Sequence, residues 1–412
     1  MQTQPPSHLL PLLERIERFY EAEVRPREAA LGQRLTDRRQ YLDAEGRLHP
    51  AVQAARREIQ RVSGREGLFA LHLPKSVGGG GLSRSEMFFV EEKVYSYGVG
   101  LNPAILAWTD GATPRLIFCG ERQRARFVEP LVRGEKTSLN AVTEPEAGSN
   151  LFDMKTSAVR RGGRWVLNGH KALITNAFEA DVANVLAVTD PGQGTRSFTY
   201  FQFETRAHLG KGYRTGRVHP TMFEDGLTGE IFLEDLELDD DAVLGERGRG
   251  FHVAMTSINW TRMRRAGMCS AWSKILIDGA VERAKSRMIG GRALGANQGV
   301  QWMVADMFLD WSQARALSLA CLAEIDAAGP WWQTKWPPQL IRNVALIKLA
   351  NDESFYRVAD RALQLHGGAG VMKDTLVNRL FLLARNLRIP GGTDEVQRTT
   401  IAETLGVRGD AP

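Results

Sequence analysis

Residues suited to holding a phosphate-bearing ligand gather in the last third of the chain. The stretch from Gln364 to Arg398 reads as a helix, a glycine turn, a second helix, a turn at Gly391–Thr393 and a final helix. Glycine lets a backbone approach phosphate closely, because it has no side chain to keep the two apart. Upstream, the planar guanidinium of Arg287 matches phosphate oxygens two at a time.

Two polar segments in the middle of the chain form a second group. Val142–Asn150 reads VTEPEAGSN, and its proline and glycine favour a tight turn. Asn168–Asn176 reads NGHKALITN and begins with a turn signal at Asn168-Gly169. On composition alone, the first segment would be an ordinary turn at a strand end and the second a half-buried strand.

Together these segments resemble the signature motifs of the acyl-CoA dehydrogenase family, flavoproteins that oxidise acyl-CoA thioesters at the α,β bond. Val142–Asn150 is similar to T-E-P-x-A-G-S-D, with asparagine in the last place, and Asn168–Asn176 to N-G-x-K-x-W-I-T-N, with Leu173 for the tryptophan. Arg287–Gln298 is similar to R-x-x-F-G-x-x-L-x-x-x-Q, with Gly290 for the phenylalanine. The motifs stay in register over nearly the whole chain. The resemblance implies FAD as the cofactor and an acyl-CoA-type thioester as the substrate.

The resemblance also assigns residues to the cofactor and to the substrate. The backbone of Val142 and Thr143 would face the pyrimidine edge of the flavin, and Thr175 would lie at its N5. The full set of implied cofactor contacts is Val142, Thr143, Gly148, Ser149, Thr175, Arg287, Gln298, Gln364, Gly367, Gly368, Thr393 and Glu395. The implied substrate contacts are Ser149, Asn259 and Arg262.

In the family, half of each FAD site comes from a neighbouring subunit, here the segment that begins at Gln364. The resemblance therefore implies a homo-oligomer, either a dimer or a dimer of dimers. It also implies a flavoprotein as a candidate electron acceptor.

The family's catalytic glutamate is absent from both of its usual positions. In most members it precedes Gly-Thr, where this chain has Gly391, and in branched-chain and long-chain members it precedes an arginine, where this chain has Thr261. The α-proton of an acyl-CoA is weakly acidic, so its removal needs a positioned base and a polarised carbonyl. If Gly391 is the empty position, Gly391→Glu is expected to raise α,β-dehydrogenation of simple acyl-CoAs.

Three interpretations of the missing base remain open. A relocated base could be Asp110, or one of the pair Glu91 and Glu92. Asp394 is a further candidate, although a cap on the last helix explains it equally well, and a solvated helix face would explain at least one of the two glutamates. Alternatively, the flavin could carry out oxygenation or β-elimination on a thioester, with the N–H of Gly391 still polarising its carbonyl. The third interpretation is a catalytically silent subunit that binds FAD or a CoA ester.

The elements that would position these residues follow from the hydrophobic period. Helical spacing over residues 1–138 gives way to two-residue alternation over 139–245 and returns over 246–412. This predicts an α+β fold with an N-terminal helical domain, a middle β-barrel or β-sandwich domain and a C-terminal four-helix bundle, which is the family's layout. A helix is expected at Gln298–Ala327, a capping box at Ser83–Glu86 and a hairpin at Gly162-Gly163.

Composition excludes several other classes of protein. The chain has 412 residues, 43% hydrophobic and 25% charged, and no apolar run long enough to span a bilayer. Its three cysteines, Cys119, Cys269 and Cys321, are far apart and suggest neither disulfides nor a metal site, so a reducing cytoplasm is expected. The net charge of +5 is spread among acidic residues, which argues against nucleic acid as a ligand.

Overall fold

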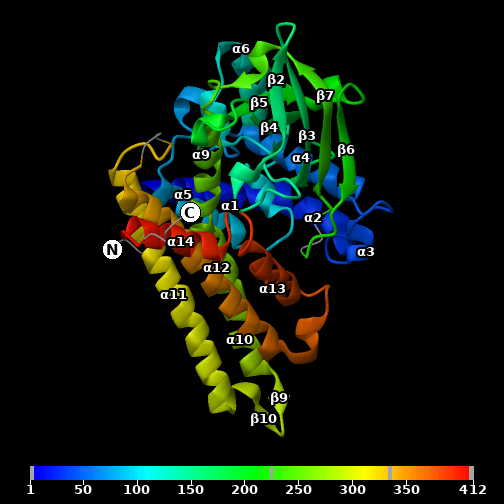
Figure 1. Ribbon diagram of the computed structural model, residues 1–412. Helices are drawn as coiled ribbons and strands as arrows, with labels where there is room; N and C mark the ends of the chain where they lie inside the picture. The colour runs from blue at the N-terminus through cyan, green and yellow to red at the C-terminus, as the bar shows by residue number, and fades with distance from the viewer. Residues whose placement is uncertain (1–3, 223–225, 333–335, 408–412) are drawn as a thin grey trace. The chain divides into compact units, whose positions relative to one another are not determined.

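The computed structural model describes residues 4–222, 226–332 and 336–407, which fold into two compact units (Figure 1). The helical unit comprises Met1–Arg38, Ser83–Asn102 and Asn259–Pro412. The sheet unit comprises Arg39–Leu82 and Pro103–Ile258. Helix α9 carries the chain from the sheet unit into the helical unit. The predicted division into three domains, with boundaries at residues 138 and 245, is a finer partition and stays a prediction.

The helical unit is built around the long helices α10, α11 and α12, which lie side by side (Figure 1). Helices α13 and α14 pack on α12, and α5 packs on α10 and α11. Its helices are α1 (Leu10–Phe19), α2 (Arg25–Leu31), α5 (Arg84–Tyr95), α10 (Arg265–Ser286), α11 (Gln298–Ala327), α12 (Pro338–His366), α13 (Leu376–Leu387) and α14 (Asp394–Thr404). A small hairpin, β9 (Met288–Ile289) with β10 (Arg292–Ala293), joins α10 to α11.

Helix boundaries in this unit follow the local signals in the sequence. Helix α11 has the predicted bounds. The predicted capping box starts α5, because the Ser83 hydroxyl accepts from the amide of Glu86 and the Glu86 carboxylate accepts from the amide of Ser83. No helix in the described part of the chain combines the length and apolar character that crossing a bilayer requires.

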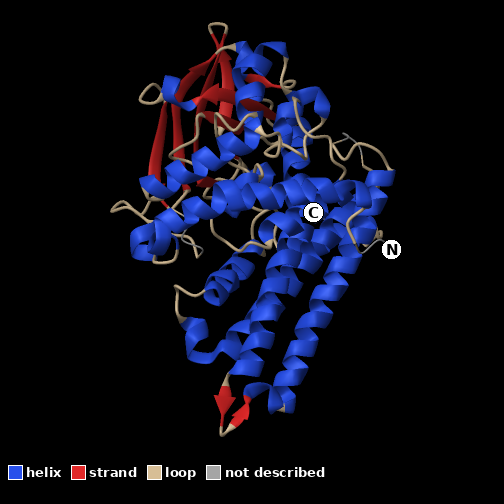
Figure 2. Ribbon diagram, turned by 180° about the vertical axis from the view of Figure 1, so that it is seen from behind, coloured by secondary structure: helices blue, strands red, loops and turns tan. Residues whose placement is uncertain are grey.

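The sheet unit contains an eight-stranded sheet, whose strands are red in Figure 2. The strand order is β6-β7-β3-β2-β4-β5-β8, with β1 also paired to β4. The strands are β1 (Ser138–Ala141), β2 (Ser157–Arg161), β3 (Arg164–Thr175), β4 (Val182–Val188), β5 (Phe198–Glu204), β6 (Tyr213–Val218), β7 (Thr228–Leu238) and β8 (Val243–Leu244). The helices are α4 (Pro50–Arg65), α6 (Glu121–Gln123), α7 (Glu129–Val132) and α8 (Thr205–His208), while α3 (Arg38–Tyr41) begins at the unit boundary and α9 spans Gly250–Met263.

The sheet divides into two halves that enclose one apolar core. Strands β2 and β4 meet through a single pairing, between Ser157 and Val188. One cluster of buried side chains draws Leu167 from one half and Val185 and Phe201 from the other. Two layers around a shared core are the arrangement expected of a sandwich. The predicted hairpin at Gly162-Gly163 is also observed, between β2 and β3.

The turn predicted at Asn168-Gly169 is wrong. Strand β3 continues through both residues, with a shift of register against β7. The Asn168 side chain accepts a hydrogen bond from the amide of Asp235, and this bond bridges the irregularity. A β-carbon at Gly169 would lie 2.2 Å from Oγ1 of Thr156, so the glycine serves close packing and not a change of direction.

Candidate active site

The loop Val142–Asn150 is anchored in the sheet unit by a buried ion pair. Nζ of Lys171 donates to the carbonyl of Val142 and to Oε1 of Glu144, at 2.9 Å in both cases. The Glu144 carboxylate also accepts from the amides of Lys155 and Thr156, at 2.6 and 2.9 Å. The whole loop is therefore fixed by two charged side chains that lie almost entirely out of contact with solvent.

The two members of this pair respond differently to burial. Burial lowers the pKa of Lys171 to about 8, although Glu144 opposes the shift. Burial also acts on Glu144, but Lys171 and the two backbone donors outweigh it, so the pKa of Glu144 falls below its ordinary value. The charged form of the carboxylate is stabilised more than that of the ammonium, because the carboxylate has more hydrogen-bond partners. Both groups are charged at neutral pH.

The anchored loop presents backbone amides and hydroxyl groups that form no hydrogen bond with the described residues. The carbonyl of Thr143 accepts from the amide of Ala172 at 3.0 Å. By contrast, the amides of Val142 and Thr143 have no hydrogen-bond acceptor among the described residues. Gly148 and Ser149 are exposed, and Thr175 is partly exposed on β3. Leu173, in place of the expected tryptophan, is 58% exposed and has a φ of +58°.

In the helical unit, buried cations hold the loop Arg388–Thr393 by its carbonyl groups. Nε of Arg262 donates to the carbonyl of Gly391 at 2.7 Å, and Nζ of Lys348 donates to that of Arg388 at 3.1 Å. The carbonyl of Gly392 accepts from Nε2 of Gln397 at 3.1 Å. The carbonyls therefore face the interior. The amides of Gly391 and Gly392 have no acceptor within the residues that the structure describes.

Gly391 and Thr261, the two positions predicted for the family base, are neighbours. A β-carbon at Gly391 would lie 3.7 Å from Oγ1 of Thr261 and 3.9 Å from Cγ of Arg262, which is ordinary contact. The expectation for Gly391→Glu needs revision, however, because Gly391 has a φ of +77°. Any side chain is strained there, whereas Thr261 lies within helix α9 and carries no such restriction.

Arg262 is the cation nearest to this position, and it is buried without a carboxylate. The residue is 9% exposed, and its Nη1 donates to Oδ1 of Asn259 at 3.2 Å. Burial lowers the pKa of Arg262 to about 10, and no neighbouring charge opposes the shift. Of the two predicted substrate contacts in α9, Arg262 contacts the carbonyl of Gly391 and Asn259 contacts Arg262. Ser149 belongs to the sheet unit.

The carboxylates considered as relocated bases already have cationic partners. Asp110 accepts from Arg56 at 2.9 Å and from Gln60 at 3.2 Å. Asp394 is buried between Lys348 and Arg388, at 2.8 and 2.5 Å.

Glu91 and Glu92 differ from expectation, because neither lies on a solvated face. Glu91 is fully buried near Arg84 and Arg264, and burial raises its pKa. Glu92 accepts from Arg315 at 2.8 and 2.9 Å. Both carboxylates therefore have a structural explanation that needs no catalytic role.

The residues predicted to bind phosphate lie on the surface of the helical unit. Arg287 follows α10 and Gln298 starts α11, and both are exposed. Gly290, where the family has phenylalanine, forms the tight β9–β10 turn with Gly291 at φ values of +56° and +79°. The positive φ that this turn requires therefore explains the glycine at position 290.

The Gly367–Gly368 turn is close to the same end of the bundle. The side chain of Arg283, one turn before Arg287, donates to the carbonyl of His366 at 3.1 Å. Gln364, Gly367 and Gly368 are exposed, and a β-carbon at either glycine would meet nothing within 4 Å. Thr393 caps α14 by accepting from the amide of Val396, and Glu395 is exposed beside it.

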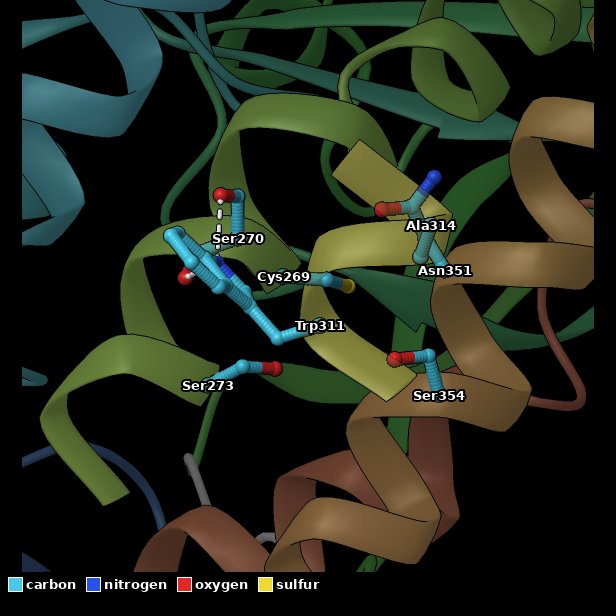
Figure 3. Close-up of a pocket in the computed structure, with 7 residues that line it drawn as sticks. All are labelled: Cys269, Ser270, Ser273, Trp311, Ala314, Asn351 and Ser354. Carbon is cyan, nitrogen blue, oxygen red and sulfur yellow. Dashed lines mark hydrogen bonds between the residues drawn. The ribbon is translucent and has the colours of Figure 1, made fainter. Parts of the chain in front are cut away.

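A small space within the bundle lies apart from these residues. Figure 3 shows it between α10, α11 and α12, with Trp311 donating its indole N–H to Oγ of Ser270 at 3.0 Å. The space is too small to admit a water molecule, and none of the predicted site residues lines it. It reflects helix packing. Within the described residues, no group of three or more His, Cys, Asp or Glu side chains could hold a metal ion.

These features fit FAD. The open amides of Val142 and Thr143 suit the polar edge of a flavin ring, and exposed Arg287 suits a pyrophosphate. The open space at Gly367 and Gly368 allows close backbone approach.

Sequence reasoning missed the residues that hold the two site loops. These are Glu144 and Lys171 in the sheet unit, and Lys348 and Gln397 in the helical unit. Glu144 lies in the motif Val142–Asn150 and Lys171 in the motif Asn168–Asn176. The opposite charges of these two residues were the signal in the sequence that could have identified the pair.

Comparison with known proteins covers nearly the whole chain. The acyl-CoA dehydrogenase N-terminal domain matches residues 10–135, the middle domain 140–236 and the C-terminal domain 248–406. The chain is 30% identical over 352 residues to 3-(aryl)acrylate reductase of Clostridium sporogenes, covering 85% of this chain and 90% of that protein. It is 30% identical over 400 residues to (R)-benzylsuccinyl-CoA dehydrogenase of Thauera aromatica, covering 96% and 94%.

Solved structures agree with this assignment. A putative acyl-CoA dehydrogenase of Mycobacterium smegmatis superposes with a TM-score of 0.83 at 26% identity, over 98% of this chain and 99% of that chain. The resemblance inferred from the motifs is thus confirmed, as are the fold class and the cofactor. The chain belongs to the acyl-CoA dehydrogenase family and is an FAD-dependent acyl-CoA oxidoreductase.

Proposed function

We propose that the protein oxidises the Cα–Cβ bond of an acyl-CoA thioester whose carbonyl oxygen binds the amides of Gly391 and Gly392. The observation that carries this proposal is the state of the Arg388–Thr393 loop. Arg262, Lys348 and Gln397 occupy its carbonyls, whereas the two glycine amides have no acceptor among the described residues. Donors held in place before the reaction are suited to stabilising the negative charge that develops on the thioester oxygen.

The proposal gives each part of the chain a defined task. The thioester oxygen is polarised by backbone donors, which makes the α-proton more acidic. This proton passes to water, because neither Gly391 nor Thr261 carries a base. Bound FAD supplies the acceptor for the hydride that leaves the β-carbon. Arg262 sets the position of the glycine loop through the carbonyl of Gly391, and Ser149 contacts the pantetheine arm.

The exposed Gln364–Gly368 segment supports a homo-oligomer in which this segment completes the FAD site of a neighbouring subunit. Gln364, Gly367 and Gly368 are exposed, and a β-carbon at either glycine would meet nothing within 4 Å. A flavoprotein is the proposed electron acceptor, in line with a relative named as the CarC subunit of a caffeyl-CoA reductase-Etf complex. A reducing cytoplasm remains the expected location.

The test adds a carboxylate beside the glycine amides and follows the flavin. Thr261→Glu places an acid next to the position that a side chain at Gly391 would occupy, without a strained backbone. A positioned general base contributes about 10²–10⁴-fold, so anaerobic bleaching of the flavin by butyryl-CoA should accelerate by a large part of that factor. Gly391→Glu should gain less, because the strain at its positive φ costs about 1–3 kcal/mol.

Thr261→Gln is the matched control, since it has the same size but no basic group. Acceleration by Thr261→Glu and not by Thr261→Gln supports a thioester bound at the glycine amides. Equal rates for the two variants, at full FAD content, would show that the α-carbon lies elsewhere. Oxygenation and β-elimination have no observation of their own in favour of them.

A further inference from the structure

Two successive glycines form the centre of the loop Arg388–Thr393. Gly391 and Gly392 have φ values of +77° and +86°, in a region that glycine enters without steric cost. Glycine also has more conformations available than any other residue, so two in succession do not hold a loop in one conformation by themselves. The amides proposed to bind the thioester belong to these two glycines. Their position must therefore be set by contacts elsewhere in the loop.

Asp394 closes this loop by joining its two ends. The amide of Asp394 donates to the carbonyl of Arg388 at 3.2 Å. Its carboxylate accepts from Nε of Arg388 at 2.5 Å and from Nζ of Lys348 at 2.8 Å. Nζ of Lys348 also donates to the carbonyl of Arg388 at 3.1 Å. Asp394, Arg388 and Lys348 therefore all contact one another at the point where the loop begins and ends.

The contacts of Asp394 continue into a buried chain of alternating charges. Lys348 lies between Asp394 and Asp352, whose Oδ2 is 3.0 Å from Nζ of the lysine. Asp352 in turn lies 3.7 Å from Nε of Arg265, and Nη2 of Arg265 donates to the carbonyl of Pro390 at 3.4 Å. All four of these charged side chains are almost completely buried. The chain of charges thus starts at the end of the loop and returns to its middle.

The start of helix α14 does not explain why Asp394 is buried among cations. Thr393 is the N-cap of this helix, and its hydroxyl accepts from the amide of Val396 at 3.3 Å. A carboxylate in the first turn also suits the helix dipole, but an exposed one would serve that purpose. The Asp394 side chain instead binds Lys348 and Arg388, which both lie outside α14. Its contacts therefore serve the loop.

We infer that Asp394 is a positioning residue for the oxidation, because it joins the ends of the loop and so keeps the amides of Gly391 and Gly392 directed at the thioester oxygen. This inference rests on the proposed function for the ligand of these amides. Asp394 acts through Arg388 and Lys348. Donors held in place stabilise a developing charge without reorganisation, and this advantage is lost when the loop can change its conformation. Loss of the carboxylate should therefore weaken recognition of the carbonyl group and leave binding of the rest of the CoA ester unchanged.

The experiment compares two CoA derivatives that differ only in the carbonyl group. Acetyl-CoA is a thioester without a β-carbon, so the flavin cannot oxidise it, and S-ethyl-CoA is the matching thioether. Their dissociation constants are measured by equilibrium dialysis with the FAD-loaded protein, and the infrared band of the bound acetyl carbonyl, labelled with carbon-13, is recorded. Wild type should bind acetyl-CoA about threefold to tenfold more tightly than S-ethyl-CoA and should lower the frequency of the carbonyl band.

Three variants decide whether Asp394 is responsible. Asp394→Asn keeps the size of the side chain, and should abolish the preference for acetyl-CoA and return the carbonyl band to the frequency of the free ester. Glu353→Gln is the matched control, because Glu353 lies 3.6 Å from the same Arg388 but on α12, and both readouts should stay as in wild type. Arg388→Gln opens the closure from its partly exposed side and should act as Asp394→Asn does. It decides the question if Asp394→Asn does not fold.

The outcomes separate this inference from the proposed function. FAD content and the thermal unfolding midpoint report whether each variant is folded. If folded Asp394→Asn keeps the preference and the band shift, or weakens both ligands equally, the inference is overturned, and Arg262 and Gln397 suffice to hold the loop. The proposed function survives that result. If wild type itself shows neither the preference nor the band shift, the carbonyl does not bind the glycine amides, and both fail.

Discussion

Buried cations hold both site loops, and they differ in their counter-ions: Lys171 and Lys348 are paired with carboxylates, whereas Arg262 has none within the described residues. Lys171 in the sheet unit donates to the carbonyl of Val142 and pairs with Glu144. Arg262 in the helical unit donates to the carbonyl of Gly391 and to neutral Asn259, with no carboxylate within ion-pair distance in the described chain. Both side chains are almost completely buried. Lys171 and Arg262 thus each fix a loop through a backbone carbonyl, the first with a counter-ion and the second without one.

This difference distinguishes a structural ion pair from a residue that can bind a ligand. Lys171 and Glu144 satisfy each other and two backbone amides, so nothing remains for a ligand to neutralise. Arg262 has a positive charge without a counter-ion and a donor, Nη2, without an acceptor among the described residues. A charge that the fold does not neutralise is maintained at a cost, which a bound anion can offset. We therefore expect changes at Lys171 to act on stability and changes at Arg262 to act on ligand binding.

The largest expected effect comes from Lys171→Met. The substitution leaves the Glu144 carboxylate buried without its cation, which costs about 3–5 kcal/mol in the free energy of unfolding. Loss of the hydrogen bond to Val142 should also release the loop and reduce FAD content. Urea unfolding and flavin absorbance measure the two effects.

Two further variants complete this test. Lys171→Met combined with Glu144→Gln should recover part of the lost stability, because glutamine keeps an acceptor for the two amides without a charge. Arg262→Met should cost about 1–2 kcal/mol, since it loses hydrogen bonds but also removes an uncompensated charge. If Arg262→Met destabilises the protein as much as Lys171→Met, the contrast between the two loops is mistaken.

A smaller effect is expected from acid acting on Glu144 in the neutralised loop. The pKa of Glu144 is lowered in the folded protein by Lys171 and by backbone donors. Such a group stabilises the fold above its unfolded pKa of 4.5, and this contribution disappears as the pH falls through the lowered value. The stability difference between wild type and Glu144→Gln should therefore shrink between pH 6 and pH 3.5, when followed by urea unfolding. A difference that stays constant over this range would mean that Glu144 is not stabilised by its charge.

The comparison also shows what the sequence could predict. Local signals correctly predicted the hairpin at Gly162-Gly163, the capping box at Ser83–Glu86 and helix α11, because each depends on residues that are close in the chain. The motif around Lys171 was recognised, but its partner Glu144 is 27 residues away, and pairing over that distance depends on the register of β3. The neighbouring positions of Gly391 and Thr261 were suggested only by their alternative use in the family.

Backbone conformation was the property least visible in the sequence. A glycine in place of glutamate suggests a missing side chain, whereas the structure gives Gly391 a φ of +77°. The glycine is therefore required by the backbone conformation of the loop. In the same way, Asn168-Gly169 resembles a turn in sequence, but Gly169 instead makes room for Thr156 within a strand.

The smallest expected effect concerns the neutral partner of Arg262. Asn259→Ala removes one hydrogen bond, from Nη1 at 3.2 Å, and should cost about 0.5–1.5 kcal/mol in stability. Arg262 remains attached to the carbonyl of Gly391, so its charge stays beside the glycine loop. Binding of butyryl-CoA to the FAD-loaded protein should therefore persist in Asn259→Ala, with at most a severalfold loss of affinity. Complete loss of butyryl-CoA binding would instead show that Asn259, and not Arg262 alone, holds the glycine loop in its binding conformation.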